Sequence, residues 1–123
     1  IIISFGGSDP NNLSYKIAKI VQEYNFSNLS FKYILGPGYS HDLSLILKYV
    51  SKSQIVINPV NFEELLASAS VLITALGTTL QKAFLMQVPC IIVDNYLSDS
   101  EEHKIISKSL KEFYSECFFS FDA

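Results

Sequence analysis

The sequence predicts an α/β fold, a doubly wound and mostly parallel sheet of six strands with helices on both faces. Short apolar runs alternate six times with longer amphipathic stretches, which is the pattern of consecutive strand–helix units. The apolar runs show little polar alternation, as expected for strands that are buried on both faces of a parallel sheet. Right-handed crossovers favour the strand order 3-2-1-4-5-6. With 123 residues, the chain is expected to form one domain over residues 1–123.

The individual elements follow from periodicity and from turn residues. Strands are expected at residues 1–5, 31–35, 54–58, 71–75, 90–93 and 117–121. Helices are expected at about 11–24, 40–50, 62–68, 78–87 and 101–113, where apolar residues recur at helical spacing. Asn61 followed by Glu64 resembles a capping box at the start of the third helix. Glycine and proline clusters, such as Gly36, Pro37 and Gly38, end the strands.

Composition and charge limit the classes of ligand. The chain is 49% apolar and 17% charged, which is typical of a globular domain. A net charge of −3 argues against a nucleic-acid surface, which needs clustered basic residues. All nine basic residues are lysines, so no guanidinium is available for bidentate phosphate binding. Any anion must be held by backbone amides, hydroxyl groups or lysine.

The sequence also indicates a compartment. Cys90 and Cys117 lack metal-ligand spacing and are expected to be buried thiols in a reducing environment. The apolar runs are too short to span a bilayer, and no signal peptide precedes the first strand. We therefore expect a cytoplasmic protein with no membrane span. A strand at residue 1 without an initiator Met suggests an excised domain whose N-terminal partner domain is missing.

Two glycine turns are the main candidates for a ligand site. In a doubly wound sheet, ligands bind beyond the carboxyl ends of the strands, near the point where the strand order reverses. Gly6, Gly7 and Ser8 follow the first strand, and a run from Gly77 to Thr79 follows the fourth. Both turns enter helices, so backbone amides and the helix dipole favour an anion there. The alternative is that these residues only shape and cap two strand–helix turns, with Ser8 and Asp9 capping the first helix.

Other polar residues give weaker signals. Gly36, Pro37 and Gly38 could line a base pocket or form a plain turn, and Asn61 and Phe62 could flank a ring or pack in the core. No residues show the arrangement of a catalytic triad or the spacing of a metal site. A solvated surface role is expected for His41, His103, Asp94, Asp99, Glu101 and Glu102.

Three alternative classes of α/β domain are excluded because their motifs are absent. The segment after the first strand reads G-G-S-D-P-N and not the dinucleotide fingerprint G-x-G-x-x-G. A Walker A loop would need G-K followed by Ser or Thr, which is absent. A phosphoacceptor receiver needs an aspartate at the end of the third strand, where this chain has Asn58.

The motifs resemble a known family. Residues 3–13, which read I-S-F-G-G-S-D-P-N-N-L, resemble the opening of the C-terminal domain of the UDP-sugar hydrolases of pseudaminic acid synthesis. Spore-coat polysaccharide biosynthesis proteins of the SpsG type share this segment. Residues 35–38 with His41, and residues 63–93, resemble later stretches of the family. More distantly, the chain is similar to the Rossmann-like C-terminal half of the glycosyltransferase B fold.

This resemblance implies a domain that binds a UDP-sugar as its substrate and needs no cofactor. Gly77, Thr78 and Thr79 would then hold the pyrophosphate, while residues 36–38 and 61–62 would border the uracil. The catalytic histidine and most of the sugar site belong to the family's N-terminal domain. The resemblance therefore implies half of an enzyme, with no catalytic residue in this chain and no turnover by this chain alone.

Three positions depart from the family pattern. Leu76 and Gln87 stand where the family has glycines, and Lys82 stands where a glutamate binds the ribose hydroxyls. A carboxylate accepts hydroxyl protons, whereas an ammonium group only donates. Lys82 follows Thr78 by four residues and Thr79 by three, so it shares their helix face and could supply charge to a phosphate; the alternative is a solvated lysine. A transferase domain for another nucleotide sugar and a non-catalytic binding module remain alternatives.

Overall fold

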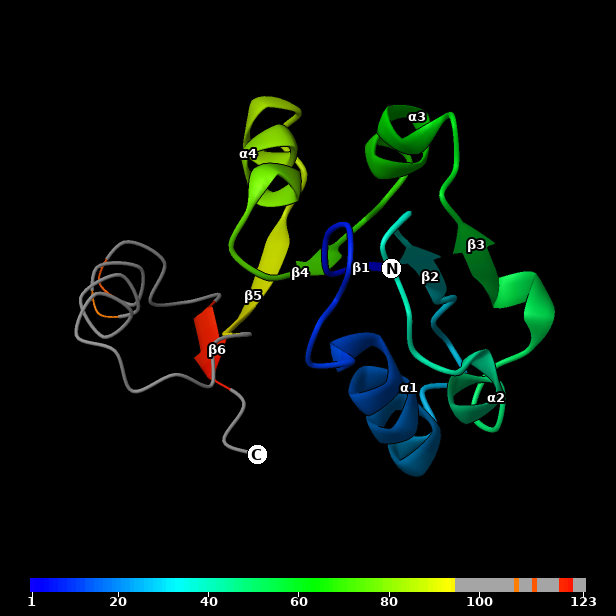
Figure 1. Ribbon diagram of the computed structural model, residues 1–123. Helices are drawn as coiled ribbons and strands as arrows, with labels where there is room; N and C mark the ends of the chain where they lie inside the picture. The colour runs from blue at the N-terminus through cyan, green and yellow to red at the C-terminus, as the bar shows by residue number, and fades with distance from the viewer. Residues whose placement is uncertain (95–107, 109–111, 113–117, 121–123) are drawn as a thin grey trace.

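The computed structural model describes residues 1–94, 108, 112 and 118–120. These residues form an α/β domain in which helices cover both faces of a parallel sheet (Figure 1). The strands are β1 (Ile2–Ser4), β2 (Lys32–Leu35), β3 (Ile55–Ile57), β4 (Leu72–Thr74), β5 (Cys90–Asp94) and β6 (Phe118–Ser120). The helices are α1 (Leu13–Tyr24), α2 (Leu43–Ile46), α3 (Phe62–Ala67), α4 (Thr78–Leu85) and the 3₁₀ helix η1 (Lys52–Gln54).

The strand order is β3-β2-β1-β4-β5-β6, and each neighbouring pair runs parallel. The order reverses between β1 and β4, because the chain first adds strands on one side of β1 and then on the other. The predicted α/β class and the doubly wound order of the first five strands are confirmed. The carboxyl ends of β1 and β4 lie side by side, since Ile3 is in register with Ile73.

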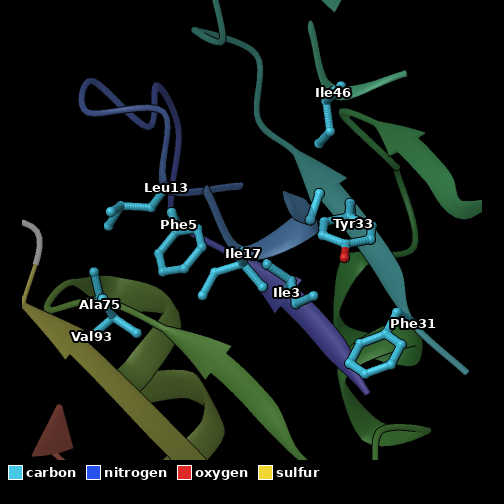
Figure 2. Packing of buried hydrophobic residues seen from close by; sticks show 10 residues of the cluster. Ile3, Phe5, Leu13, Ile17, Phe31, Tyr33, Ile46, Ala75 and Val93 are labelled. Atoms are coloured by element: carbon cyan, nitrogen blue, oxygen red, sulfur yellow. The ribbon is translucent and has the colours of Figure 1, made fainter. Parts of the chain in front are cut away.

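The core has two layers, one on each face of the sheet. Successive residues of a strand point to opposite faces, and those of β1 pack in different clusters. Ile3 packs with Ile17 of α1 on the face that α1 and α2 cover (Figures 1 and 2). Ile2 packs with Leu66 of α3 and Ala83 of α4 on the opposite face. Burial on both faces explains why the strand segments are almost continuously apolar.

Two predicted helices are longer than the structure allows. The α-helix predicted at 40–50 is confined to Leu43–Ile46. Beyond it, Tyr49 N–H bonds to Ile46 O three residues back, so the last turn tightens and the chain turns toward η1 and β3. α4 ends at Leu85 and not at residue 87. Gln87 adopts a left-handed conformation (φ 57°) and Val88 N–H bonds to Ala83 O, which closes the helix.

The capping box predicted at Asn61 is wrong, because the Asn61 side chain makes no capping hydrogen bond to α3. Its backbone (φ −106°, ψ 40°) lies outside the extended region that a capping side chain usually needs. The structure instead has a capping box at η1, between Ser51 and Gln54. The helix predicted at 101–113 lies mainly outside the described residues, as do Asp99, Glu101, Glu102, His103 and Cys117, which are also the subject of sequence-based predictions.

Two further observations concern the described residues alone. Within them, no helix is long and apolar enough to cross a membrane. Cys90 is half-buried, and its thiol donates to Val88 O at 3.3 Å.

Candidate functional site

Two cavities open at the carboxyl ends of the strands, where the sequence places the glycine turns. Gly6, Gly7, Thr78 and Thr79 line both of them. The Phe62 cavity has a volume of about 220 Å³ and the Gly77 cavity a volume of about 250 Å³. The turn after β1 and the first turn of α4 therefore form the wall between two adjacent hollows.

The Phe62 cavity lies between the β1, β2 and β3 ends and the start of α4. Its lining residues are Ser4, Gly6, Gly7, Ile34, Gly36, Pro37, Asn58, Pro59, Phe62, Thr78, Thr79 and Lys82. Lys82 carries the one formal charge among them. The described residues that line the Gly77 cavity are all uncharged: Phe5, Gly6, Gly7, Ser8, Pro10, Thr74, Ala75, Leu76, Gly77, Thr78 and Thr79.

Two largely buried residues that carry hydroxyl groups line the Phe62 cavity. Ser4, at the end of β1, is 3% exposed, and Thr79, in the first turn of α4, is 8% exposed. Neither hydroxyl is hydrogen-bonded to another group in the described part of the chain. Buried polar groups in native proteins are normally paired with protein or water. These two hydroxyls are therefore available to a ligand or to water in the cavity.

The start of α4 leaves backbone donors free in the same place. The first helical hydrogen bond runs from Gln81 N–H to Gly77 O at 3.4 Å. The amides of Thr78, Thr79 and Leu80 therefore have no carbonyl partner within the helix. No side-chain cap satisfies them, since the N-cap residue is Gly77. A helix start of this kind favours an anionic group.

Lys82 has a carboxylate partner at the rim of the Phe62 cavity. Its Nζ lies 2.9 Å from Glu63 Oε1 and 5.6 Å from the centroid of the Phe62 ring. The hydrogen bond from Lys82 is the main reason that the pKa of the Glu63 carboxyl is lowered. The two side chains are 47% and 59% exposed. The Lys82 ammonium is therefore bonded to Glu63, and it is directed neither into bulk solvent nor toward the free amides at the start of α4.

The loop after β2 packs directly on the loop after β1. A Cβ atom at Gly36 would lie 2.6 Å from Gly6 O, Gly7 Cα and Gly7 O, so only glycine fits there. Gly38 N–H donates to Gly7 O at 2.7 Å. Gly36 also lines the Phe62 cavity, whereas Gly38 lines neither cavity. These glycines hold the first turn in place as well as bordering the hollow.

Asp9 anchors the other side of the same loop. Its buried carboxylate accepts hydrogen bonds from Leu13 N–H at 2.8 Å and Ser14 N–H at 2.9 Å, which confirms the expected capping of the first helix by Asp9. His41 Nε2–H donates to Asp9 O at 2.7 Å. His41 is therefore half-buried, and the expected surface role is wrong for it. Its contact ties the loop after β2 to the loop after β1.

Tyr39 strengthens this connection. Its hydroxyl donates to Asn12 Oδ1 at 2.7 Å, and its ring meets His41 edge-on at 5.2 Å between centroids. Burial first, and then the negative charge of Asp9, raise the pKa of Tyr39 to about 12. Tyr39 is therefore a neutral hydrogen-bond donor at ordinary pH. Its bond to Asn12 and the bond of His41 to Asp9 join the loop that carries Gly36 to the loop that carries Gly6 and Gly7.

Most residues predicted from sequence to hold a nucleotide are brought together. Ten of them line a cavity: Gly6, Gly7, Ser8, Gly36, Pro37, Phe62, Gly77, Thr78, Thr79 and Lys82. Gly38 and Asn61 line neither. The sequence prediction missed Ser4, Asn58 and Pro59, whose positions at the carboxyl ends of β1 and β3 were the available signal. No group of three or more metal-ligating side chains occurs among the described residues.

Comparisons with known proteins give one relative. No protein-family model and no solved structure matches the chain. The chain is 33% identical over 98 residues to the uncharacterized protein MJ1062 of Methanocaldococcus jannaschii. The match covers 76% of this chain but only 20% of the relative, so the chain spans about a fifth of the relative's length.

Proposed function

We propose that this domain binds a nucleotide sugar, specifically a UDP-sugar, across the two cavities at the carboxyl ends of β1 and β4. The observation that carries the proposal is the pair of residues Ser4 and Thr79, which are largely buried and line the Phe62 cavity, and whose hydroxyls have no partner in the described chain. Because these hydroxyls are reachable from the cavity and are not used by the described chain, they can bond to a ligand there.

The charged and helix-start groups around the cavities favour an anionic ligand. The start of α4 offers unpaired amides, Thr78 and Thr79 offer hydroxyls, and Lys82 offers an ammonium group. Among the described residues that line the two cavities, none carries a carboxylate. A phosphate group has several acceptor oxygens and a negative charge, so it matches this set of donors.

The dimensions favour an elongated ligand. Each cavity alone is smaller than the roughly 300 Å³ at which typical ligand sites begin. The two cavities share four lining residues, with the start of α4 between them. A nucleoside diphosphate joined to a sugar is long enough to occupy both, with its phosphates at the shared wall. The Phe62 ring and Pro37 then border the end of the ligand that carries the base.

The resemblance to the UDP-sugar hydrolase and SpsG-type family supports UDP as the nucleotide. It also supports a role in the synthesis of surface polysaccharide or nonulosonic acid. On this basis we propose that the domain belongs to a cytoplasmic hydrolase of surface-polysaccharide or nonulosonic acid synthesis, in which the N-terminal domain of the family supplies the catalytic residues. The second candidate is a donor-binding domain for another nucleotide sugar, or a non-catalytic module. Lys82, which replaces the family's ribose-binding glutamate, favours this second candidate.

The test is a calorimetric and saturation-transfer NMR titration of the chain with UDP, CMP, GDP and uridine. We expect UDP to bind, and we expect Thr79→Val to weaken it by about tenfold, because the isosteric change removes a hydroxyl donor to a charged acceptor. Ser27→Ala, an exposed hydroxyl change in the loop between α1 and β2, is the matched control and should leave binding unchanged. A folded sample that binds none of the nucleotides refutes the proposal, while tighter binding of CMP or GDP favours the second candidate.

A further inference from the structure

We propose that Lys82 and Glu63 form a charge-exchange pair, in which the Lys82 ammonium leaves Glu63 to bind a phosphate group of the ligand in the Phe62 cavity. This inference rests on the proposed function and deepens it, because it names the residue that recognises the charge of the ligand. Glu63 is then an internal competitor that occupies the ammonium while the cavity holds no anion.

The position of Lys82 supports the phosphate contact. Lys82 is on the same face of α4 as Thr78 and Thr79, and all three side chains line the Phe62 cavity. The unpaired amides of the helix start lie one turn away from it. A phosphate held by those amides is therefore next to Lys82, which is the one charged residue among the described residues that line the two cavities.

The position of Glu63 supports the exchange. Its carboxylate oxygen is 2.9 Å from Lys82 Nζ, but Glu63 itself lines neither cavity. Both side chains are about half exposed or more, and exposed ion pairs contribute little to stability because solvent screens them. A phosphate carries more charge than a carboxylate and presents more acceptor oxygens. It therefore competes well for the ammonium once it is fixed by the helix start.

Phe62 gives the ammonium a fixed place on the cavity wall. Lys82 Nζ lies 5.6 Å from the centre of the Phe62 ring, within the distance at which a cation is attracted to an aromatic face. This attraction persists when Glu63 is no longer bonded. Lys82 therefore keeps close to the cavity in both arrangements, and the exchange needs only a change of side-chain partner.

The experiment titrates UDP, uridine and inorganic pyrophosphate against the unmodified chain and four variants, one of which is a control. Lys82→Ala should weaken UDP and pyrophosphate by about tenfold, the usual effect of losing a charge-assisted hydrogen bond, and should change uridine affinity less than about twofold. Glu63→Gln removes the competitor at constant shape and should tighten both phosphate ligands by about threefold. In the double variant, Glu63→Gln should have no effect.

Glu64→Gln is the matched control. Glu64 follows Glu63 in α3, is exposed, and makes no contact with Lys82, so the change removes an equal charge without releasing the ammonium. It should leave all three affinities unchanged.

Each outcome separates this inference from the proposed function. UDP that binds equally well to the unmodified chain, Lys82→Ala and Glu63→Gln overturns the charge exchange and leaves nucleotide binding intact. Pyrophosphate binding that depends on Lys82, with no further gain from the uridine moiety, supports the charge exchange and overturns nucleotide specificity. Equal tightening by Glu63→Gln and Glu64→Gln overturns the exchange, because it shows a general charge effect. Absence of binding by every ligand overturns both.

Discussion

Replacing Gly36 with alanine should destabilise the domain, because the new methyl group has no space. Its Cβ would lie 2.6 Å from three backbone atoms of Gly6 and Gly7. Overpacking usually costs about 1–3 kcal/mol, and the upper end applies because backbone atoms move less readily than side chains. If the two loops separate, the bond from Gly38 N–H to Gly7 O is also lost, at about 1 kcal/mol.

We therefore expect the free energy of unfolding to fall by about 3 kcal/mol for Gly36→Ala, measured by urea denaturation followed by circular dichroism. Gly7→Ala is the matched control, since a Cβ at Gly7 meets nothing within 4 Å and Gly7 does not have a positive φ. This variant should unfold within about 0.5 kcal/mol of the unmodified chain but bind UDP more weakly, because Gly7 lines both cavities. A Gly36→Ala variant as stable as Gly7→Ala would refute the close packing of the two loops.

Three further predictions concern the supporting structure. Asp9→Asn should cost about 1 kcal/mol of unfolding free energy, because the amide keeps only one of the oxygens that bond Leu13 N–H and Ser14 N–H; an unchanged urea midpoint would contradict the capping role. Tyr33→Phe should be neutral or should stabilise the domain by up to about 1 kcal/mol, because the buried Tyr33 hydroxyl has no partner among the described residues; a clear loss of stability would show that the hydroxyl is bonded. Burial raises the pKa of both Tyr33 and Tyr39 to about 12, above the ordinary value of 10.0. The folded state retains these protons longer than the unfolded state, so their contribution is intact below pH 10 and is lost as the pH rises to about 12. A phenolate absorbance titration should show a late phase that shrinks in the Tyr33→Phe and Tyr39→Phe variants, and a single phase near the ordinary value would contradict this.

The sequence was sufficient to predict the α/β sheet and the edge of the sheet at which the two cavities open. The runs at residues 1–5 and 71–75 lack polar alternation because β1 and β4 are covered on both faces. Parallel strands joined by right-handed crossovers leave few possible orders. The turns at Gly6 and Gly77 then had to meet at one edge, and in the structure both line the Gly77 cavity.

Contacts between segments far apart in the chain were decided only by the tertiary structure. Periodicity predicted a helix at 40–50, but the path of the chain to β3 limits α2 to Leu43–Ile46. The sequence indicates only that Gly36 belongs to a turn. In the structure, a side chain at this position is excluded by the backbone of Gly6 and Gly7, about thirty positions earlier in the chain. No local pattern could reveal that contact.

Lys82 shows the same division between sequence and structure. Helical spacing alone placed it on the face that carries Thr78 and Thr79, because side chains three and four residues apart are neighbours on a helix. Its partner Glu63 belongs to another helix, and the pairing depends on how α3 and α4 pack on the sheet. The sequence by itself determined which residues face the carboxyl edge, because periodicity and strand order are local and topological properties. Only the packed structure decided which of those residues touch one another, because such contacts depend on distances between segments that the sequence does not encode locally.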